Sequence, residues 1–225
     1  MSEELNIHLP EKIAMAFAIE RGGVFFRSFF GGRGSGKSQS CAKVAALMAS
    51  NEPLKIACIR KFQNSIKESF YAEVKTAIKS NEYFQSVYDV GVDFIRCKTG
   101  SEFIFKGINN NPDSIKSLAN IDIWIIEEAE ELDEIAWQTL LPTVRGDKVE
   151  VWIIFNPKKK NSPCWKRFGA DSKLEGLIKC EVNYLDNPFF PANLEMQRKH
   201  DEKTMPKELY EHIWLGKFFG HCFLS

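Results

Sequence analysis

A glycine-rich stretch near the amino end constrains the fold of this chain most strongly. It runs Gly31-Gly32-Arg33-Gly34-Ser35-Gly36-Lys37-Ser38 and matches the phosphate-binding pattern G-x-x-x-x-G-K-[ST] at every fixed position. The apolar, aromatic residues 24–30 before it predict a buried strand, and the Ala-rich residues 39–48 after it predict a mostly buried helix. A strand, a glycine-rich loop and a helix in this order predict a phosphate-binding loop.

The residue types of this loop suit a triphosphate and its magnesium ion. Glycines let backbone N–H groups turn toward phosphate oxygens without a Cβ in the way, and the helix start directs its positive dipole end at the anion. We expect Lys37 to reach the β- and γ-phosphates and the Ser38 hydroxyl to bind Mg²⁺. The expected nucleotide-binding residues are Gly32, Arg33, Gly34, Ser35, Gly36, Lys37, Ser38 and Gln39.

A second apolar run ends in acidic residues. Residues 121–126 predict a buried strand, and Glu127 and Glu128 follow it directly. Because ligands bind outside the carboxyl ends of strands in such sheets, we expect both carboxylates near the phosphate loop. Glu127, in place of the more usual aspartate, is expected to hold the Mg²⁺ shell through water, and Glu128 to orient and deprotonate an attacking water. The alternative is that residues 127–131 are only the solvated acidic start of a helix.

Four further polar residues are candidates for the site. Arg33 is a candidate arginine finger in cis, or else a solvent-facing loop residue. Asn156, after the apolar strand predicted at residues 149–155, is a candidate γ-phosphate sensor and coupling residue, or else a turn residue before a proline. Arg60 and Arg145 are candidate phosphate or trans-subunit contacts, and equally candidate members of structural ion pairs.

Strand and helix patterns alternate along the rest of the chain. A hairpin is expected at residues 93–98 and 102–106, turned at Thr99-Gly100, and a loop at residues 109–113. The alternation predicts an α/β fold with a mostly parallel sheet wrapped by helices, in a core of residues 1–185 followed by a small helical appendage at 186–220. The other expected strands are residues 54–59 and 177–184, and the other expected helices are residues 10–20, 64–79 (with Asn64 as its N-cap), 133–141, a short one from 191, and 206–215.

Composition excludes few function classes. The 225 residues suffice for one sizeable α/β core. The 30 basic and 30 acidic residues balance, which neither favours nucleic-acid binding nor excludes a local basic patch. The turn Lys158-Lys159-Lys160 is a candidate contact for a nucleic-acid backbone, or else a solvated loop.

Cysteine usage indicates a reducing compartment. None of the six cysteines forms a C-x-x-C pair, and several lie in apolar runs, so buried free thiols are expected. No signal peptide and no apolar run long enough to span a membrane is present in the sequence, so a cytosolic protein is expected.

With these residues placed, the sequence resembles the N-terminal ATPase domain of tailed-phage terminase large subunits, the motors that package viral DNA. The resemblance extends from about Phe26 to Lys217, nearly the whole chain. The phosphate loop is shared by many protein families, whereas the combined set of motifs is far more specific. The matching stretches are residues 31–38, 60–65, 107–112, 115–118, 127–130, 141–145, 155–157, 183–188 and 212–216.

The resemblance implies roles for several of these residues. The chain is expected to be a P-loop NTPase that hydrolyses ATP with Mg²⁺. Glu127-Glu128 matches the family's acidic pair, and Arg33 matches its loop arginine, which favours the finger in cis. Residues 155–157 match the motif that couples hydrolysis to DNA movement, and residues 183–216 resemble the family's small lid or linker subdomain.

The resemblance also implies partners. Family members act as a ring, commonly of five subunits, docked on the capsid portal, and a terminase small subunit delivers the double-stranded viral DNA. We therefore expect a phage or prophage protein of the host-cell cytoplasm, with no membrane partner.

The chain departs from the family pattern after its last motif. Family members continue into an RNase H-like nuclease domain, whereas only five residues follow Gly220 here. No nuclease domain and no DNA cleavage are therefore expected from this chain, which is either an expressed fragment or a truncated prophage gene.

Two other classes of function stay open at the level of sequence. One is another P-loop enzyme, such as a different DNA-dependent ATPase or a small-molecule kinase. A kinase usually has an arginine-rich lid, and residues 186–220 hold only Arg198. The other is a nucleotide-binding prophage remnant without turnover, against which the intact Lys37, Ser38 and Glu128 argue.

Overall fold

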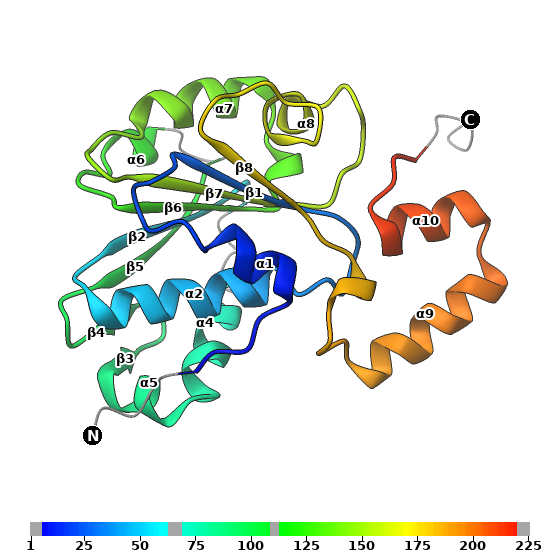
Figure 1. The fold of residues 1–225 in the computed structure, drawn as a ribbon. Helices are drawn as coiled ribbons and strands as arrows, with labels where there is room; N and C mark the ends of the chain where they lie inside the picture. The colour runs from blue at the N-terminus through cyan, green and yellow to red at the C-terminus, as the bar shows by residue number, and fades with distance from the viewer. Residues whose placement is uncertain (1–5, 63–68, 109–112, 220–225) are drawn as a thin grey trace.

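The computed structural model describes residues 6–62, 69–108 and 113–219 (Figure 1). These residues form one eight-stranded sheet with the strand order β3-β4-β5-β2-β6-β7-β1-β8. The predicted α/β fold with a mostly parallel sheet flanked by helices is confirmed. Three sequence-based expectations, the helix N-cap at Asn64, the loop at 109–112 and the free thiol of Cys222, fall outside the described residues.

The sheet has a parallel part that carries the site and a small antiparallel edge. Strands β5, β2, β6, β7, β1 and β8 pair in parallel, whereas β3, β4 and β5 pair antiparallel. Strands β6 and β7 are buried along their whole length because helices cover both faces, which explains their unbroken apolar sequences. The strands are β1 (Phe26–Phe30), β2 (Lys55–Arg60), β3 (Tyr88–Val90), β4 (Ile95–Cys97), β5 (Glu102–Gly107), β6 (Ile123–Glu127), β7 (Glu150–Phe155) and β8 (Leu177–Glu181).

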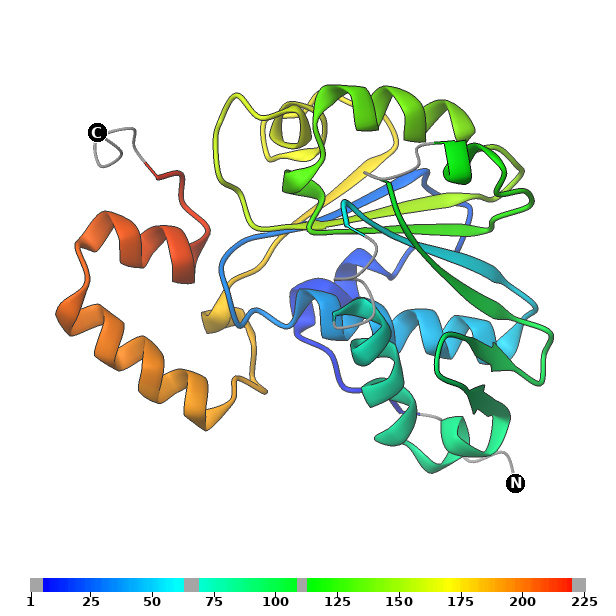
Figure 2. The ribbon, with the colours of Figure 1, turned by 180° about the vertical axis from the view of Figure 1, so that it is seen from behind.

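Two layers of helices enclose the sheet (Figures 1 and 2). Helices α1, α2, α4 and α5 lie on one face, and α6, α7 and α8 on the other, each over its own hydrophobic cluster. Within the described residues the helices are α1 (Glu11–Ala16), α2 (Lys37–Asn51), α4 (Phe70–Lys79), α5 (Glu82–Val87), α6 (Asp113–Lys116), α7 (Glu134–Leu140), α8 (Pro163–Phe168), α9 (Ala192–Thr204) and α10 (Lys207–Leu215), with 3-10 turns η1 (Ala129–Glu131), η2 (Leu141–Thr143) and η3 (Tyr184–Asp186).

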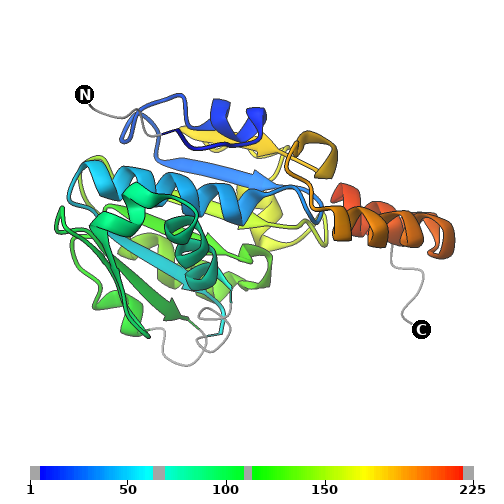
Figure 3. The ribbon, with the colours of Figure 1, turned by 90° about the horizontal axis from the view of Figure 1, so that it is seen from below.

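Helices α9 and α10 form the expected helical appendage. Figure 3 shows that they project beyond the sheet on the side where β1 and β8 end. The buried indole of Trp214 on α10 donates to Asp201 Oδ2 on α9 (3.1 Å), which fixes the two helices to each other. The division of the chain at residues 185 and 186 stays a prediction.

Helix α1 is shorter than expected, and a buried ion pair contacts the chain where the helix ends. A helix over residues 10–20 was expected, but α1 ends at Ala16. The guanidinium of Arg27 donates to the carbonyls of Ala16 and Ile19 and to both carboxylate oxygens of Glu150 (2.8 and 2.9 Å). Glu150 also accepts from the Trp152 indole (2.8 Å), so both oxygens of this fully buried carboxylate are hydrogen-bonded.

Strand β8 ends at Glu181, before the expected residue 184, because Tyr184 begins η3, and several short elements account for further differences. The hairpin of β4 and β5 is confirmed, with Gly100 in its turn at φ 94°, but β3 and the helices α5, α6 and α8 were missed. Two of these helices carry recognisable start signals. The side chain of Asn81 caps α5, and Ser162 caps α8 with Pro163 at the first helical position.

The described cysteines are free and buried, as expected. In the parts of the chain that the structure describes, no helix is long and apolar enough to cross a bilayer.

Candidate functional site

The phosphate loop lies at the carboxyl end of β1 and leads directly into α2. Gly34 and Gly36 adopt left-handed backbone conformations, with φ of 76° and 79°, that residues with a side chain rarely adopt. Gly36 is the N-cap of α2, whose first residue is Lys37. The positive end of a fifteen-residue helix is therefore directed at the loop, as anion binding requires.

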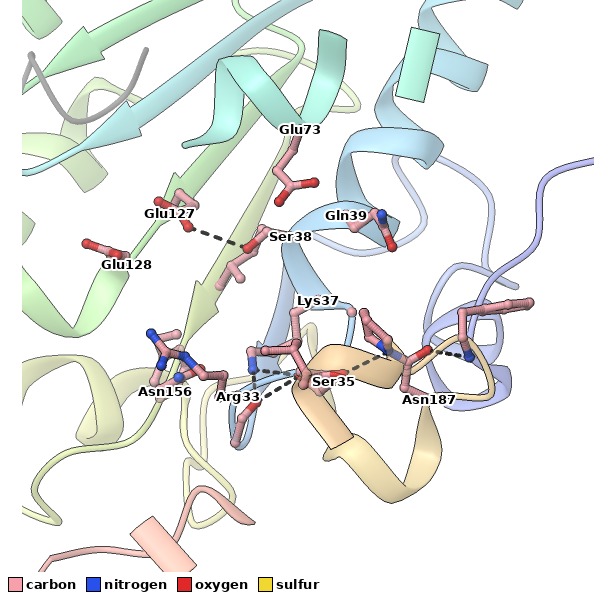
Figure 4. Close-up of a pocket in the computed structure, with 18 of the residues that line it drawn as sticks. Arg33, Ser35, Lys37, Ser38, Gln39, Glu73, Glu127, Glu128, Asn156 and Asn187 are labelled. Carbon is pink, nitrogen blue, oxygen red and sulfur yellow. Dashed lines mark hydrogen bonds between the residues drawn. The ribbon is translucent and has the colours of Figure 1, made fainter. Parts of the chain in front are cut away.

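Lys37 is folded back onto the loop. Its ammonium donates to the carbonyls of Gly31 (3.1 Å) and Gly32 (2.9 Å) and to Ser35 Oγ (2.8 Å), as Figure 4 shows. The side chain is buried, and this burial lowers the pKa of Lys37 to about 7. An ammonium held by weak neutral acceptors in a poorly solvated place is ready to exchange them for an anion.

The two acidic residues meet the loop from β6. Glu127 is the last residue of that strand, and its Oε1 accepts from the Ser38 hydroxyl at 3.4 Å (Figure 4). Burial raises the pKa of Glu127, and the charge of Arg60 opposes the shift. Glu128 is exposed and adopts a left-handed conformation (φ 50°), an uncommon state for a residue with a side chain and one found at active sites.

Arg60 connects the two carboxylates. It ends β2, the neighbour of β6 in the sheet. Its Nε lies 3.3 Å from Glu127 Oε2 and 2.9 Å from Glu128 Oε2, and a second nitrogen also contacts Glu128. In this structure Arg60 is thus a member of an ion-pair network with both acids, one of the two alternatives that the sequence left open.

The loop and the acids line one open cavity of about 880 Å³. Arg33, Gln39 and Asn156 line it as well, and the side chains of all three are exposed. Arg145 does not line it. It precedes the amino end of β7, away from the carboxyl ends where the cavity lies, and its Nε donates to the Pro142 carbonyl (3.1 Å).

The segment after β8 holds the phosphate loop, a role that sequence reasoning missed. Asn183 Oδ1 accepts from Gly32 N (2.7 Å), and Asn187 Nδ2 donates to the Gly34 carbonyl (2.8 Å; Figure 4). The carbonyl of Ile213 in α10 accepts from Arg33 N (2.7 Å). Both asparagines lie in stretches quoted for the family resemblance, but nothing in the sequence shows which backbone group each amide contacts.

The approach of α10 to the loop explains a glycine in it. A Cβ on Gly32 would lie 2.0 Å from the Trp214 carbonyl oxygen, so no other residue fits there without a backbone shift. Gly32 is therefore needed for packing against the appendage as well as for the turn.

Further cavity residues were not singled out from the sequence. Glu73 of α4 points into the cavity (Figure 4), and burial raises its pKa. His8, Lys43 and Phe189 line its other part. Residues 1–23 contain no motif, so no pattern in the sequence indicates His8.

The basic turn after β7 is connected to the acidic turn after β6. Glu130 Oε1 accepts from the backbone N–H groups of Lys158 (3.1 Å) and Lys159 (3.3 Å), and the Lys158 ammonium pairs with Glu131. Lys158 therefore already has an acidic partner, while the side chains of the basic turn are exposed to solvent.

Known proteins resemble this chain in sequence. A family model described as phage terminase large subunit matches residues 24–217. The terminase large subunit of Bacillus phage SPP1 is 26% identical over 204 residues, which are 84% of this chain and 48% of that protein. The chain thus spans about half the length of that curated relative.

Solved structures share the fold. A large terminase from a thermophilic bacteriophage matches with a TM-score of 0.72 at 14% identity, over 94% of this chain and 54% of that one. That protein has also been solved in complex with ADP and with ATP-γ-S. The ATPase domain of the Thermus phage P74-26 large terminase matches with a TM-score of 0.61 at 15% identity, over 93% of this chain and 92% of that one. At these identities the likeness is one of fold.

Proposed function

Because this chain belongs to the phage terminase large subunit family, we propose that it hydrolyses ATP to drive double-stranded viral DNA into a procapsid. One observation carries the proposal. Lys37 and Ser38 of the phosphate loop line a single cavity with Glu127, the last residue of β6, and Glu128, which follows it, although about ninety residues separate the two pairs. A phosphate cradle beside a carboxylate pair is what hydrolysis of a bound triphosphate requires.

The residues divide into binding and chemical roles. The loop from Gly32 to Gln39 binds the phosphates, and Lys37 carries charge to the β- and γ-phosphates. Glu128, which is solvent-accessible, orients the attacking water and accepts its proton. Arg33 stabilises charge on the transferring phosphoryl group, and Asn156 responds to the γ-phosphate from the end of β7.

Magnesium is the expected companion of the triphosphate, and the donor set fits it. The Ser38 hydroxyl and the Glu127 carboxylate, 3.4 Å apart, are the hard oxygen donors that Mg²⁺ prefers. Ser38 would bind the ion directly and Glu127 through water. When bound, Mg²⁺ neutralises negative charge on the phosphate oxygens.

Arg60 contacts both carboxylates before the reaction begins. While Arg60 contacts Glu128 Oε2, the guanidinium occupies an acceptor position on that oxygen that the attacking water needs. We propose that Glu128 exchanges Arg60 for the attacking water once nucleotide is bound. A phosphate or trans-subunit contact of Arg60 or Arg145 stays a prediction.

The proposed partners follow from the family. They are double-stranded DNA, the terminase small subunit, the capsid portal and further copies of this chain in a ring, in the cytoplasm of the host cell. Residues 186–220 would act as the lid or linker, since they hold the phosphate loop through Asn187 and Ile213. The turn at residues 158–160 is the candidate DNA contact.

Steady-state phosphate release from ATP with Mg²⁺, with and without double-stranded DNA, tests the proposal. We expect DNA-stimulated turnover in the wild type and a loss of about 10²–10³-fold in Lys37→Ala, which removes a charge from the transferring phosphates. Nucleotide binding without turnover in any oligomeric form would favour the prophage remnant. Turnover that DNA never alters would favour another P-loop enzyme.

The lowered pKa of Lys37 predicts a pH dependence of binding. Near pH 7 part of the Lys37 population is neutral, and phosphate oxygens favour the charged form, so nucleotide raises this pKa again. Binding therefore takes up a proton above pH 7, and ATP affinity falls as pH rises from 7 to 9, by at most about tenfold per pH unit.

Calorimetry at pH 8 in two buffers of different ionisation enthalpy measures that proton uptake. Lys37→Arg is the control, because arginine stays charged throughout this range. An uptake of equal size in Lys37→Arg would assign the proton to another group.

A further inference from the structure

The cavity extends well beyond the groups that act on phosphate. One part contains Glu127, Glu128 and Asn156. The other is lined by His8, Lys43, Phe189, Pro191 and Leu194, to which the proposed hydrolysis assigns no role. These residues come from the segment before α1, from α2, from the segment that leads into α9 and from the first turn of α9 itself.

The direction of a nucleotide in the cavity is fixed by the chemistry of the site. Its γ-phosphate must approach Glu128, and its other phosphates lie over the loop and the start of α2. The remainder of the molecule therefore continues past Gln39. Lys43, one turn further along the same face of α2 and about 6 Å along its axis, is the next residue of that helix to line the cavity.

Phe189 is placed as a wall of that part of the cavity. Phe189 is 49% exposed, and it borders the cavity. Its backbone N–H donates to Asn187 Oδ1 (2.9 Å), while Asn187 Nδ2 donates to the Gly34 carbonyl of the phosphate loop (2.8 Å), as Figure 4 shows. One asparagine thus sets the position of this ring relative to the phosphates.

The groups around this ring suit a flat, polar-edged ligand. The His8 ring centroid lies 6.1 Å from that of Phe189, at an interplanar angle of 46°. The Lys43 ammonium lies 5.8 Å from the Phe189 centroid and donates to the His8 carbonyl (3.2 Å). An aromatic face with a cation and an imidazole beside it fits a heteroaromatic base and the ribose that bears it.

We propose that Phe189 stacks on the nucleobase of the bound nucleotide, with Lys43 and His8 at the edge of the base and its ribose. The proposal rests on the proposed nucleotide binding and extends it to specificity. Because Phe189 belongs to the appendage, the appendage supplies part of the nucleotide site. Inorganic polyphosphate, which has no base, makes no use of this wall.

Binding of Mg·ATP and of magnesium tripolyphosphate to the same variants tests the proposal by calorimetry. Base–aromatic stacking predicts that Phe189→Ala weakens ATP binding by about five- to hundredfold and leaves tripolyphosphate binding unchanged. Phe189→Tyr, which keeps the ring, restores ATP affinity. Met196→Ala is the matched control, since Met196 is an exposed apolar residue of the same appendage that does not line the cavity.

Other results of this experiment would contradict either the stacking role of Phe189 or the proposed function. An equal loss of both ligands in Phe189→Ala, or no loss of either, would exclude the stacking role. A wild type that binds neither ligand would overturn the proposed function itself and the base site with it. The thermal midpoint of each variant, expected to stay near the wild-type value because Phe189 is half exposed, separates a binding effect from unfolding.

Discussion

Replacing Glu128 by glutamine is expected to lower ATP turnover by about 10²–10⁴-fold, because the amide cannot accept the proton of the attacking water. ATP binding should stay close to wild type, since Glu128 contributes no phosphate contact in the proposed roles. The fold should also persist, because the side chain is solvent-exposed and an amide oxygen still accepts from Arg60. Single-turnover hydrolysis together with calorimetric binding of ATP measures both effects.

Glu134→Gln is the matched control for that variant. Glu134 is also an exposed glutamate paired with an arginine, since its Oε2 accepts from Arg167 (2.9 Å), but it lies on α7 and does not line the cavity. ATP turnover by the Glu134→Gln variant should equal that of the wild type. Turnover in Glu128→Gln within about threefold of wild type would mean that another group is the base, because general base catalysis contributes far more than this.

Replacing Glu150 by alanine is expected to lower the free energy of unfolding by about 3–5 kcal/mol. The carboxylate is completely buried, and it accepts hydrogen bonds from Arg27, the Trp152 indole and Gly22 N (3.0 Å). Without it the Arg27 guanidinium stays charged in the core with no counter-ion, which is more costly than losing both charges together. Urea unfolding followed by tryptophan fluorescence measures the change.

Two further variants test whether the lower free energy of unfolding in Glu150→Ala comes from the unpaired buried charge. In Glu102→Ala the removed carboxylate belongs to a surface pair with Lys55 (3.1 Å), so the cost should be at most about 1 kcal/mol. Joint replacement of Arg27 by Met and Glu150 by Leu should recover much of the stability, because no charge is then buried. If Glu150→Ala costs no more than Glu102→Ala, the buried pair is not a major stabilising contact.

The sequence predicted the centre of the site because the positions of these residues follow from local backbone structure and from the rules of parallel sheets. The order of strand, glycine-rich loop and helix places Lys37 and Ser38 through backbone conformation alone. Glu127 lies opposite Ser38 because parallel strands end at the same edge of the sheet, so one apolar run followed by an acid was enough to predict their meeting.

Contacts between distant segments were not predictable in the same way. The expected end of α1 was wrong, and at its observed end Arg27, which pairs with Glu150 123 residues away, donates to the carbonyl of Ala16. For Arg60 the sequence left two alternatives open, a phosphate or trans-subunit contact and a structural ion pair. The position of an arginine in the sequence does not show which group its side chain contacts. Asn183 and Asn187 were placed in a motif, but their contacts with the loop depend on how the segment after β8 packs against it.

The same long-range contacts determine at what point of synthesis the phosphate loop acquires its hydrogen-bond acceptors. The loop amides of Gly32 and Arg33 obtain their acceptors from Asn183, 151 residues later, and from Ile213. A nascent chain that has emerged only as far as β7 therefore contains every phosphate-binding residue, but its loop lacks both of these restraints. Nucleotide affinity should consequently mature late in translation, so that ATP acts as a ligand of the finished protein and not as a template for its folding.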